Sequence, residues 1–232
     1  MKQDFTIFAK KLGVEFTDIS LLQTACTHRS YLNEVKGTKA AHNERLEFLG
    51  DAVLELVVTD FLYKKYPHKQ EGDLTAYRSA IVNTNSLSRV ADHIGVNEHL
   101  ILSKGEAKDT GRARAIILAD AVEAIIGAIY LDQGYDTVEA FIARNILEVI
   151  KIEDIVSKKL WLDAKSRFQE RAQEVTGQTP IYKTVKETGP DHDKQFTVGV
   201  FIGDTQIAQG TGPSKNEAEQ KAAEKGIEVK GW

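Results

Sequence analysis

HNERLEFLGDAVLELVVTD, residues His42–Asp60, carries long apolar side chains at helical spacing, and no proline follows until Pro67. This pattern predicts a helix. On a 3.6-residue repeat, one set of apolar side chains shares a face and the carboxylates share the opposite face. The apolar face holds Leu46, Leu49, Val53, Leu56 and Val57, and the acidic face holds Glu44, Glu47, Asp51 and Glu55.

Further apolar side chains stand among the acids of this helix, at Phe48, Leu54, Val58 and Leu62. We therefore expect the helix to be apolar nearly all round and buried, together with its carboxylates. A buried carboxylate without a counter-charge takes up a proton or holds a cation. Between Leu46 and Tyr63 the sequence offers no Lys or Arg to its four acids, Glu47, Asp51, Glu55 and Asp60.

The size and composition of the chain fit a globular protein of one large or two small domains. It has 232 residues, of which 42% are hydrophobic and 28% charged. The one cysteine, Cys26, excludes an internal disulfide, fits a reducing compartment and is expected to be a small core residue. No apolar run is long enough for a signal peptide or a membrane span, so we expect a cytoplasmic protein without a membrane partner.

The overall charge weighs against a nucleic-acid partner, because the net charge is −4 and the pI is near 5.9. Residues 1–160 carry 20 Lys and Arg against 23 Asp and Glu, and residues 161–232 carry ten against 11, so neither part of the chain is basic. Binding to a nucleic acid would have to rest on the local placement of basic side chains.

The segments around the opening helix are also predicted to be helical. Residues 1–36 predict helices with a turn near Thr17–Ser20, and Pro67 and Gly72 mark a loop. Residues 74–95 predict one further helix that ends at Gly95. Residues 102–115 predict a glycine-containing loop whose bases are either solvated or in contact with phosphate: Lys104, Lys108, Arg112 and Arg114.

A second acidic helix is predicted at residues 117–134, ILADAVEAIIGAIYLDQG. Asp120 and Glu123 stand at i and i+3 on one face of this almost wholly apolar run, and no Lys or Arg occurs between Arg114 and Arg144. Two such helices in one helical domain would bring four carboxylates together. Because no Cys or clustered His accompanies them, these oxygen ligands suit Mg²⁺ or Mn²⁺ rather than Zn²⁺.

The pattern changes character near residue 162. Residues 163–177 predict a helix, residues 181–187, 194–202 and 205–212 alternate apolar and polar side chains as strands, and residues 213–229 predict a final helix. In that helix Ser214 and Glu217 have capping-box spacing, and Lys215 stands beside the N-terminus, a weak signal for a phosphate site. We expect a first domain at 1–152, a linker at 153–162 and a second domain at 163–232.

Several motifs, found in one order, resemble those of bacterial ribonuclease III. NERLEFLGDAVLE at 43–55 is similar to the family signature, and THRSYLNE at 27–34 and LADAVEAIIGAIYLD at 118–132 are similar to its flanking motifs. FQE at 168–170, GPDH at 189–192 and GTGPSK at 210–215 resemble a double-stranded-RNA-binding domain. The resemblance covers nearly the whole chain.

The resemblance implies an all-α N-terminal endonuclease domain and a small α+β C-terminal RNA-binding domain. It implies a homodimer in which each subunit cuts one strand of double-stranded RNA and leaves 5′-phosphate and 3′-hydroxyl ends with short 3′ overhangs. The implied substrates are ribosomal RNA precursors and structured messenger RNAs. The implied cofactor is Mg²⁺, with Mn²⁺ as a substitute.

The resemblance also implies roles for single residues. The implied metal cluster consists of the same acids that the charge pattern selects: Glu47, Asp51, Asp120 and Glu123. We expect Glu47, Asp120 and Glu123 to be the most direct ligands, and Asp51 and Glu123 to act in catalysis by holding the attacking water. Glu44 and Glu71 match positions that line the cleavage groove, and Phe48 matches a dimer contact. The implied RNA contacts are Gln169, Glu170, His192 and Lys215.

The chain departs from the family pattern at three positions. The final helix of the family usually begins Ser-Lys-Lys and often has a third base one turn on, whereas this chain has Asn216 and Gln220 there. This difference predicts weaker RNA affinity and a flatter salt dependence than in a fully basic relative. Ile116 also stands where a small residue usually precedes the catalytic helix.

A competing interpretation is a non-catalytic double-stranded-RNA-binding protein that keeps the fold for dimerisation. The loss of any one of the four acids would favour it, and all four are present, which favours the enzyme. A purely structural helical domain would leave four unmatched carboxyl groups without a task.

Overall fold

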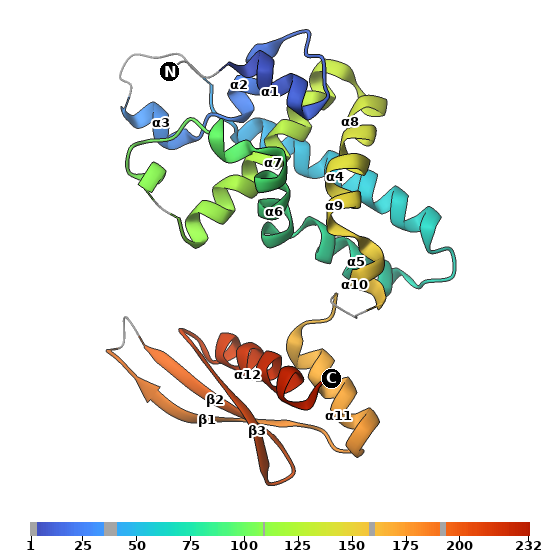
Figure 1. Ribbon diagram of the computed structural model, residues 1–232, viewed down its shortest axis with the longest axis vertical. Coiled ribbons are helices and arrows are strands. Elements are labelled where there is room, and N and C mark those ends of the chain that lie inside the picture. The colour runs from blue at the N-terminus through green and yellow to red at the C-terminus, as the bar shows by residue number, and fades with distance from the viewer. Residues whose placement is uncertain (1–3, 35–40, 109, 158–160, 191–193) are drawn as a thin grey trace. The chain divides into compact units, whose positions relative to one another are not determined.

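The chain divides into two compact units, Met1–Lys158 and Lys159–Trp232. The computed structural model describes residues 4–34, 41–108, 110–157, 161–190 and 194–232. Unit 1 is helical, and unit 2 has a three-stranded antiparallel sheet with two helices (Figure 1). The predicted fold class is confirmed. Within the described ranges, no helix has both the length and the apolar character needed to cross a bilayer.

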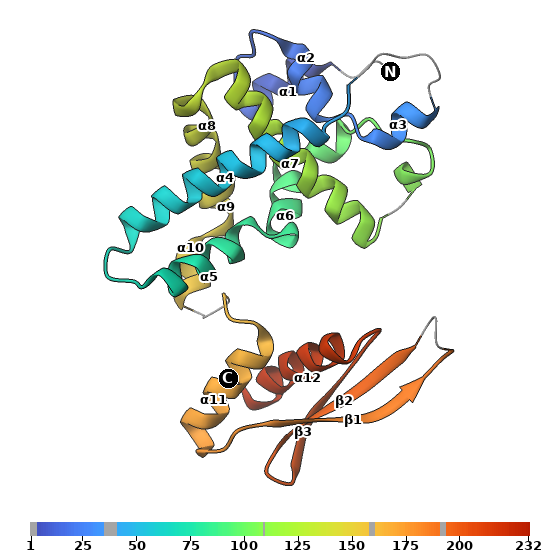
Figure 2. The ribbon, with the colours of Figure 1, turned by 180° about the vertical axis from the view of Figure 1, so that it is seen from behind.

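Two long helices, α4 (Glu44–Lys65) and α7 (Arg112–Gln133), form the centre of unit 1 and make its most extensive contact (Figure 2). Their backbones touch where they cross. A Cβ atom at Gly50 would lie 1.7 Å from the Glu123 carbonyl oxygen, and one at Gly127 would lie 2.2 Å from the Leu46 carbonyl oxygen. Only glycine fits at both positions, and this close approach brings the acidic parts of the two helices together.

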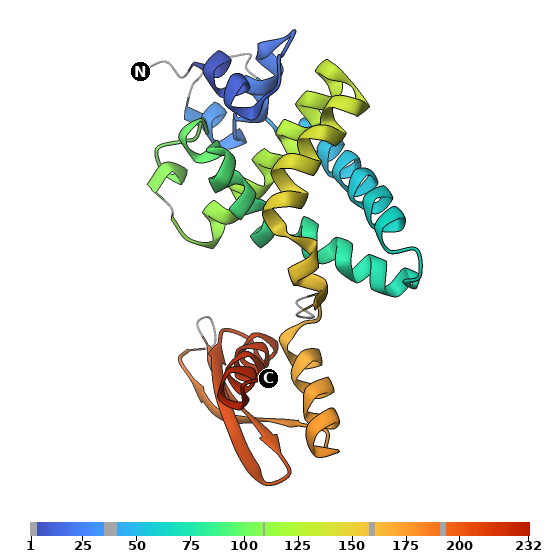
Figure 3. The same ribbon diagram turned by 45° about the vertical axis from the view of Figure 1, so that its right-hand side comes forward.

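The remaining helical elements pack around this pair. The helical stretch of residues 135–157, drawn in yellow, follows one side of the unit (Figure 3). In chain order the elements are α1 (Phe5–Leu12), α2 (Ile19–Ala25), α3 (Arg29–Glu34), α5 (Glu71–Val82), α6 (Thr84–Ile94), the 3-10 turns η1 (Val96–Glu98) and η2 (Glu106–Lys108), α8 (Tyr135–Ile142), the π-helical η3 (Ala143–Leu147), α9 (Glu148–Ile150) and α10 (Ile152–Ser157). Cys26 is a free, buried thiol in this core, as predicted.

The single helix predicted at 74–95 is two helices. Asn83 has extended backbone angles, and its side-chain oxygen accepts a hydrogen bond from the backbone N–H of Ser86 at 2.9 Å. An asparagine of this kind caps a new helix and ends the one before it. The helix α6 ends at Gly95 with φ of 78°, as predicted. The predicted loop at 102–115 is shorter, because α7 already begins at Arg112.

The helix α4 is buried on one side only, which corrects the expectation of a helix buried all round. The side chains of Phe48 and Leu56 are 82% and 57% exposed. Because the acidic side is open, two of the four carboxylates that were expected to lack a counter-charge lie near basic side chains. Arg78 NH1 lies 4.0 Å from Glu55 Oε2, and Lys64 Nζ lies 2.5 Å from Asp60 Oδ2. Asp60 and Lys64 have i,i+4 spacing, and Lys64 is the first residue after the stretch from Leu46 to Tyr63, which contains no Lys or Arg.

Part of the predicted linker is helical and belongs to unit 1. Ile152 and Ile155 of α10 lie three residues apart and therefore face the same side of the helix. Both side chains are buried. The neighbouring Glu153 forms an ion pair with Lys65 at the end of α4.

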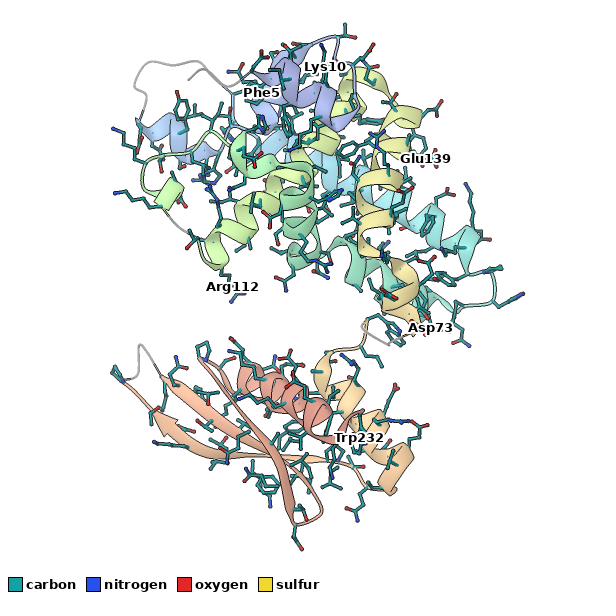
Figure 4. The ribbon with its side chains drawn as sticks, in the orientation of Figure 1. Phe5, Lys10, Asp73, Arg112, Glu139 and Trp232 are labelled. Carbon is teal, nitrogen blue, oxygen red and sulfur yellow. The ribbon has the colours of Figure 1, made fainter. Side chains whose placement is uncertain are left out.

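Unit 2 consists of α11 (Ala164–Thr176), β1 (Ile181–Thr188), β2 (Gln195–Ile202), β3 (Thr205–Gly212) and α12 (Lys215–Lys230), with strand order β1-β2-β3. Both helices pack on one face of the sheet around the buried Phe168 and Val200. Trp232 lies just beyond the end of α12 (Figure 4). Its ring centroid is 5.2 Å from that of Phe168. A Cβ atom at Gly210 would lie 2.3 Å from the backbone nitrogen of Ala222, so α12 lies directly on β3.

Candidate functional site

Three carboxylates meet where α4 and α7 cross. Glu47 of α4 and Asp120 and Glu123 of α7 each offer one oxygen, and these oxygens lie within 4.8 Å of one another. Asp120 and Glu123 are adjacent on one face of α7 because they are three residues apart. Glu47 reaches them because Gly50, one turn later on α4, rests against the Glu123 backbone. The cluster is therefore a product of the helix crossing.

The electrostatic environment of the cluster disfavours three separate negative charges. Burial raises the pKa of Glu123 to about 8, and the charges of Asp51, Asp120 and Glu47 raise it too. Burial also raises the pKa of Glu47 and of Asp120, with neighbouring acids adding to the effect at Glu47. A bound divalent cation would remove this repulsion, and the all-oxygen donor set suits Mg²⁺ or Mn²⁺.

Asp51 lies at the edge of the cluster rather than within it. It is exposed on α4, one turn after Glu47. Its charge raises the pKa of both Glu123 and Glu47, so it acts on the site through space. Of the four predicted acids, three have carboxylate oxygens that lie close together, and the fourth, Asp51, lies beside them.

The two predicted groove residues lie in different places. Glu44, in the first turn of α4, accepts a hydrogen bond from Arg29 NH1 at 3.0 Å and raises the pKa of Glu47. Glu71, the first residue of α5, lines a separate cavity of about 470 Å³ with Tyr63 and Arg78. Among the described residues, Glu44 adjoins the carboxylate cluster, whereas Glu71 lines the cavity between α4 and α5.

One histidine near the cluster received no role from the sequence, although it belongs to the THRS motif. Burial raises the pKa of Asp120, and the nearby His28 offsets part of this rise; the His28 Nδ1 atom lies 2.8 Å from Ser30 Oγ. The same hydroxyl oxygen accepts a hydrogen bond from the backbone N–H of Ser103 at 3.1 Å. The backbone N–H of Asn43 donates to Thr27 O at 2.9 Å, so this motif ties the start of α4 to the segment that leads into α7.

In unit 2, the predicted RNA contacts that the structure describes lie on the surface. Gln169 and Glu170 are exposed on α11. Lys215 opens α12, just after Ser214, whose hydroxyl oxygen accepts a hydrogen bond from the Glu217 N–H at 3.2 Å. This bond confirms one half of the predicted capping box. The fourth predicted contact, His192, lies outside the described residues.

The three departures from the family pattern have different surroundings. The Gln220 side chain donates to Asp163 Oδ1 at 3.1 Å and accepts from the Lys165 N–H at 3.3 Å, so it holds the start of α11. Asn216 is exposed. Ile116 is 43% exposed and lines an open cavity together with Arg112. The side chain of Arg112 extends away from α7 (Figure 4). Nothing in the structure explains an isoleucine at position 116.

Comparison with known proteins identifies relatives of both units. Residues 18–150 match the family model described as Ribonuclease-III-like, and residues 164–230 match the double-stranded RNA binding motif. Ribonuclease 3 of Borreliella burgdorferi is 44% identical over 96% of this chain and 90% of that protein. Ribonuclease 3 of Streptococcus pneumoniae strain P1031 is 44% identical over 98% of this chain and 97% of that protein.

Solved structures of a related nuclease domain agree with these matches. The nuclease domain of ribonuclease III from Campylobacter jejuni is 38% identical, with a TM-score of 0.57 over 65% of this chain and 98% of that chain. A second structure of that domain, described for flexibility in a region involved in dimer formation, is 39% identical, with a TM-score of 0.57 over 62% of this chain and 97% of that chain.

Proposed function

Because this chain belongs to the ribonuclease III family, we propose that its acidic cluster holds Mg²⁺ for the hydrolysis of double-stranded RNA. The chain is an endoribonuclease with a double-stranded-RNA-binding domain. The convergence of Glu47, Asp120 and Glu123 at the α4–α7 crossing carries the metal proposal. Three close carboxylates with raised pKa values favour a hard divalent cation, and Mn²⁺ is the expected substitute.

We assign the hydrolytic step to these acids. Water attacks the phosphorus and loses a proton, a new P–O bond forms, and the bond to the 3′-oxygen breaks as that oxygen takes up a proton, which leaves 5′-phosphate and 3′-hydroxyl ends. A divalent cation bound there would supply Lewis acidity for the activation of water and for the negative charge on the leaving oxygen. Glu47, Asp120 and Glu123 would hold the ion, and Asp51 and Glu123 would orient the attacking water. The exposure of Asp51 beside the half-buried Glu123 supports this division of work.

We propose that the enzyme is a homodimer that cuts both strands and leaves short 3′ overhangs. Phe48 supports this proposal, because its ring is 82% exposed and it directly follows the ligand Glu47. A large exposed aromatic side chain marks an interaction surface. Glu44 and Glu71 would line the groove that receives the RNA.

The RNA contacts of unit 2 are proposed from the shape of an A-form duplex, in which the deep major groove hides the bases. Gln169, Glu170 and His192 would meet the minor groove, and Lys215 would meet phosphate. We expect ribosomal RNA precursors and structured messenger RNAs as substrates. The buried free thiol of Cys26 fits a cytoplasmic location.

Cleavage of a long RNA duplex tests the metal proposal. The parent should cut the duplex with Mg²⁺ and stop when the metal is chelated. Glu123→Ala should lose at least a hundredfold in rate while binding the duplex with unchanged affinity, because unit 2 and the groove remain intact. Full-rate cleavage after exhaustive chelation would overturn the metal assignment. A parent that binds the duplex and leaves it intact would favour the non-catalytic binding protein instead.

A further inference from the structure

A single carboxylate in unit 2 stands between two lysines. Glu187, the second-last residue of β1, has Oε2 3.3 Å from Lys194 Nζ and Oε1 3.5 Å from Lys215 Nζ. The register of the sheet pairs Glu187 with Phe196 on β2. Both ammonium groups lie over the Phe196 ring, at 5.9 Å for Lys194 and 5.6 Å for Lys215. We call these four side chains the Glu187 cluster.

The Glu187 cluster joins two of the three parts of unit 2 to which RNA contacts are assigned, the β1–β2 connection and the start of α12. Lys194 directly precedes β2 and so ends the β1–β2 connection, and Lys215 is the first residue of α12. All three charged groups are open to solvent, with side-chain exposures of 38% for Lys194, 37% for Glu187 and 59% for Lys215. A phosphate group can therefore reach either lysine.

The carboxylate of Glu187 carries its charge at neutral pH. The hydrogen bond from Lys194, followed by the positive charges of both lysines, lowers its pKa. A lysine that is already neutralised by a carboxylate releases fewer counterions when it meets a phosphate. The negative charge of Glu187 would also lie near the phosphate that Lys215 contacts, and like charges repel.

We propose that Glu187 sets the affinity of this enzyme for double-stranded RNA by competing with the RNA backbone for Lys215 and Lys194. The inference rests on the proposed phosphate contact of Lys215. It adds an internal competitor to the basic surface, which already has Asn216 in place of a second base at the start of α12. The strength of binding would then depend on an acid of β1 as well as on the bases of α12.

The test compares Glu187→Gln with the parent in binding to a blunt RNA duplex of about two helical turns. Full-length proteins are used with a chelator, so that no cleavage occurs, and the dissociation constant is measured across a salt series. The variant keeps the size of the side chain and removes its charge. We expect it to bind about threefold to tenfold more tightly at low salt, with a steeper dependence on salt.

Two control variants separate this effect from simpler ones. Glu224→Gln removes the same charge from an exposed site of α12, about 14 Å further along the helix than Lys215. At about 0.1 M salt this distance exceeds the Debye length of about 10 Å, so at that point of the salt series the variant should change affinity little. Lys215→Ala should weaken binding, and adding Glu187→Gln to it should give a smaller gain than in the parent, because the two residues are coupled.

The possible results are distinct. If Lys215→Ala weakens binding but Glu187→Gln binds no more tightly than Glu224→Gln, the competition is absent and the inference is overturned. If Glu187→Gln binds more weakly than the parent, Glu187 orients Lys215 toward phosphate, which also overturns it. If Lys215→Ala binds as tightly as the parent, the proposed phosphate contact fails, and the inference fails with it.

Discussion

Among single residues, Glu123 has the environment least suited to a charged carboxylate. Burial and the negative charges of Asp51, Asp120 and Glu47 raise its pKa to about 8. Without metal, the side chain therefore carries a proton at neutral pH. A divalent cation bound at the proposed site would have to displace that proton, so metal binding and folding stability would both be linked to pH at this one position.

We predict that the metal-free protein loses stability as pH rises from about 5 to 8, and that Glu123→Gln reduces this loss. The pKa of Glu123 is about 8 in the folded state against an ordinary value of 4.5, so the folded state binds more protons between these values. Stability is then highest at the acid end of the window. At pH 8 the variant should melt at a higher temperature than the parent, as measured by scanning calorimetry without metal.

Added Mg²⁺ is the control for this prediction. It should raise the melting temperature of the parent at pH 8 and have a much smaller effect on Glu123→Gln, which lacks a ligand carboxylate. An equal melting temperature for both metal-free proteins at pH 8 would contradict the prediction, because it would show that ionisation of Glu123 does not reduce the stability of the folded state.

At the scale of secondary-structure elements, the crossing of α4 and α7 is the feature on which the site depends. Each helix contributes carboxylates that are unexceptional on a helix surface. They become a cluster because Gly50 and Gly127 allow the two backbones to touch. A close helix crossing is intolerant of added volume, since packed interiors have little space to yield.

We predict that Gly50→Ala lowers the free energy of unfolding of unit 1 by ~1–3 kcal/mol or more and weakens metal binding. Its Cβ atom would lie 1.7 Å from the Glu123 carbonyl oxygen, so the helices must move apart. Chemical denaturation without metal measures the stability, and Mn²⁺ titration measures the binding.

Gly72→Ala is the matched control for the crossing. A Cβ atom at Gly72, in the first turn of α5, meets nothing within 4 Å. This variant should be neutral or more stable by up to ~1 kcal/mol, because alanine is the better helix former. Equal stability of the two alanine variants would contradict the account of the crossing.

At the scale of the whole molecule, α4 presents exposed apolar side chains as well as part of the proposed metal site. Phe48, Leu56 and Tyr63 are 82%, 57% and 72% exposed. Their spacing along the helix places them on one side of it. An exposed apolar stripe of this kind marks an interaction surface, and the proposed homodimer would cover it.

We predict that Phe48→Ala raises the dissociation constant of the dimer by at least tenfold, because a central aromatic side chain contributes strongly to an interface. Sedimentation measurements over a range of concentrations provide the test. Ile7→Ala, which truncates an apolar side chain that is 65% exposed on α1, should leave the dimer unchanged. A Phe48→Ala protein that stays dimeric at the same concentrations as the parent would refute the contact.

The sequence was sufficient for the broad architecture, because helical and strand periodicities are local properties. Two acid-bearing helices and an α-β-β-β-α unit follow from the spacing of apolar residues, and the motifs identify the family. Local patterns did not predict that the Asn83 side chain ends one helix and caps the next. They also did not predict the ion pair of Asp60 with Lys64, because Lys64 lies just beyond the stretch in which the acids were compared with bases. It also took α4 to be buried all round, because periodicity does not reveal how many neighbours surround a helix.

Tertiary packing was needed to bring distant residues together. No local pattern shows that Gly50 touches the Glu123 backbone, that Glu47 thereby joins Asp120 and Glu123, or that Asp51 stays at the edge. The same holds for Glu187, which lies between lysines from two other parts of unit 2. The physical reason is common to both sites: side-chain spacing along the chain sets the faces of each element, whereas the contacts between elements depend on which faces meet and how closely their backbones approach.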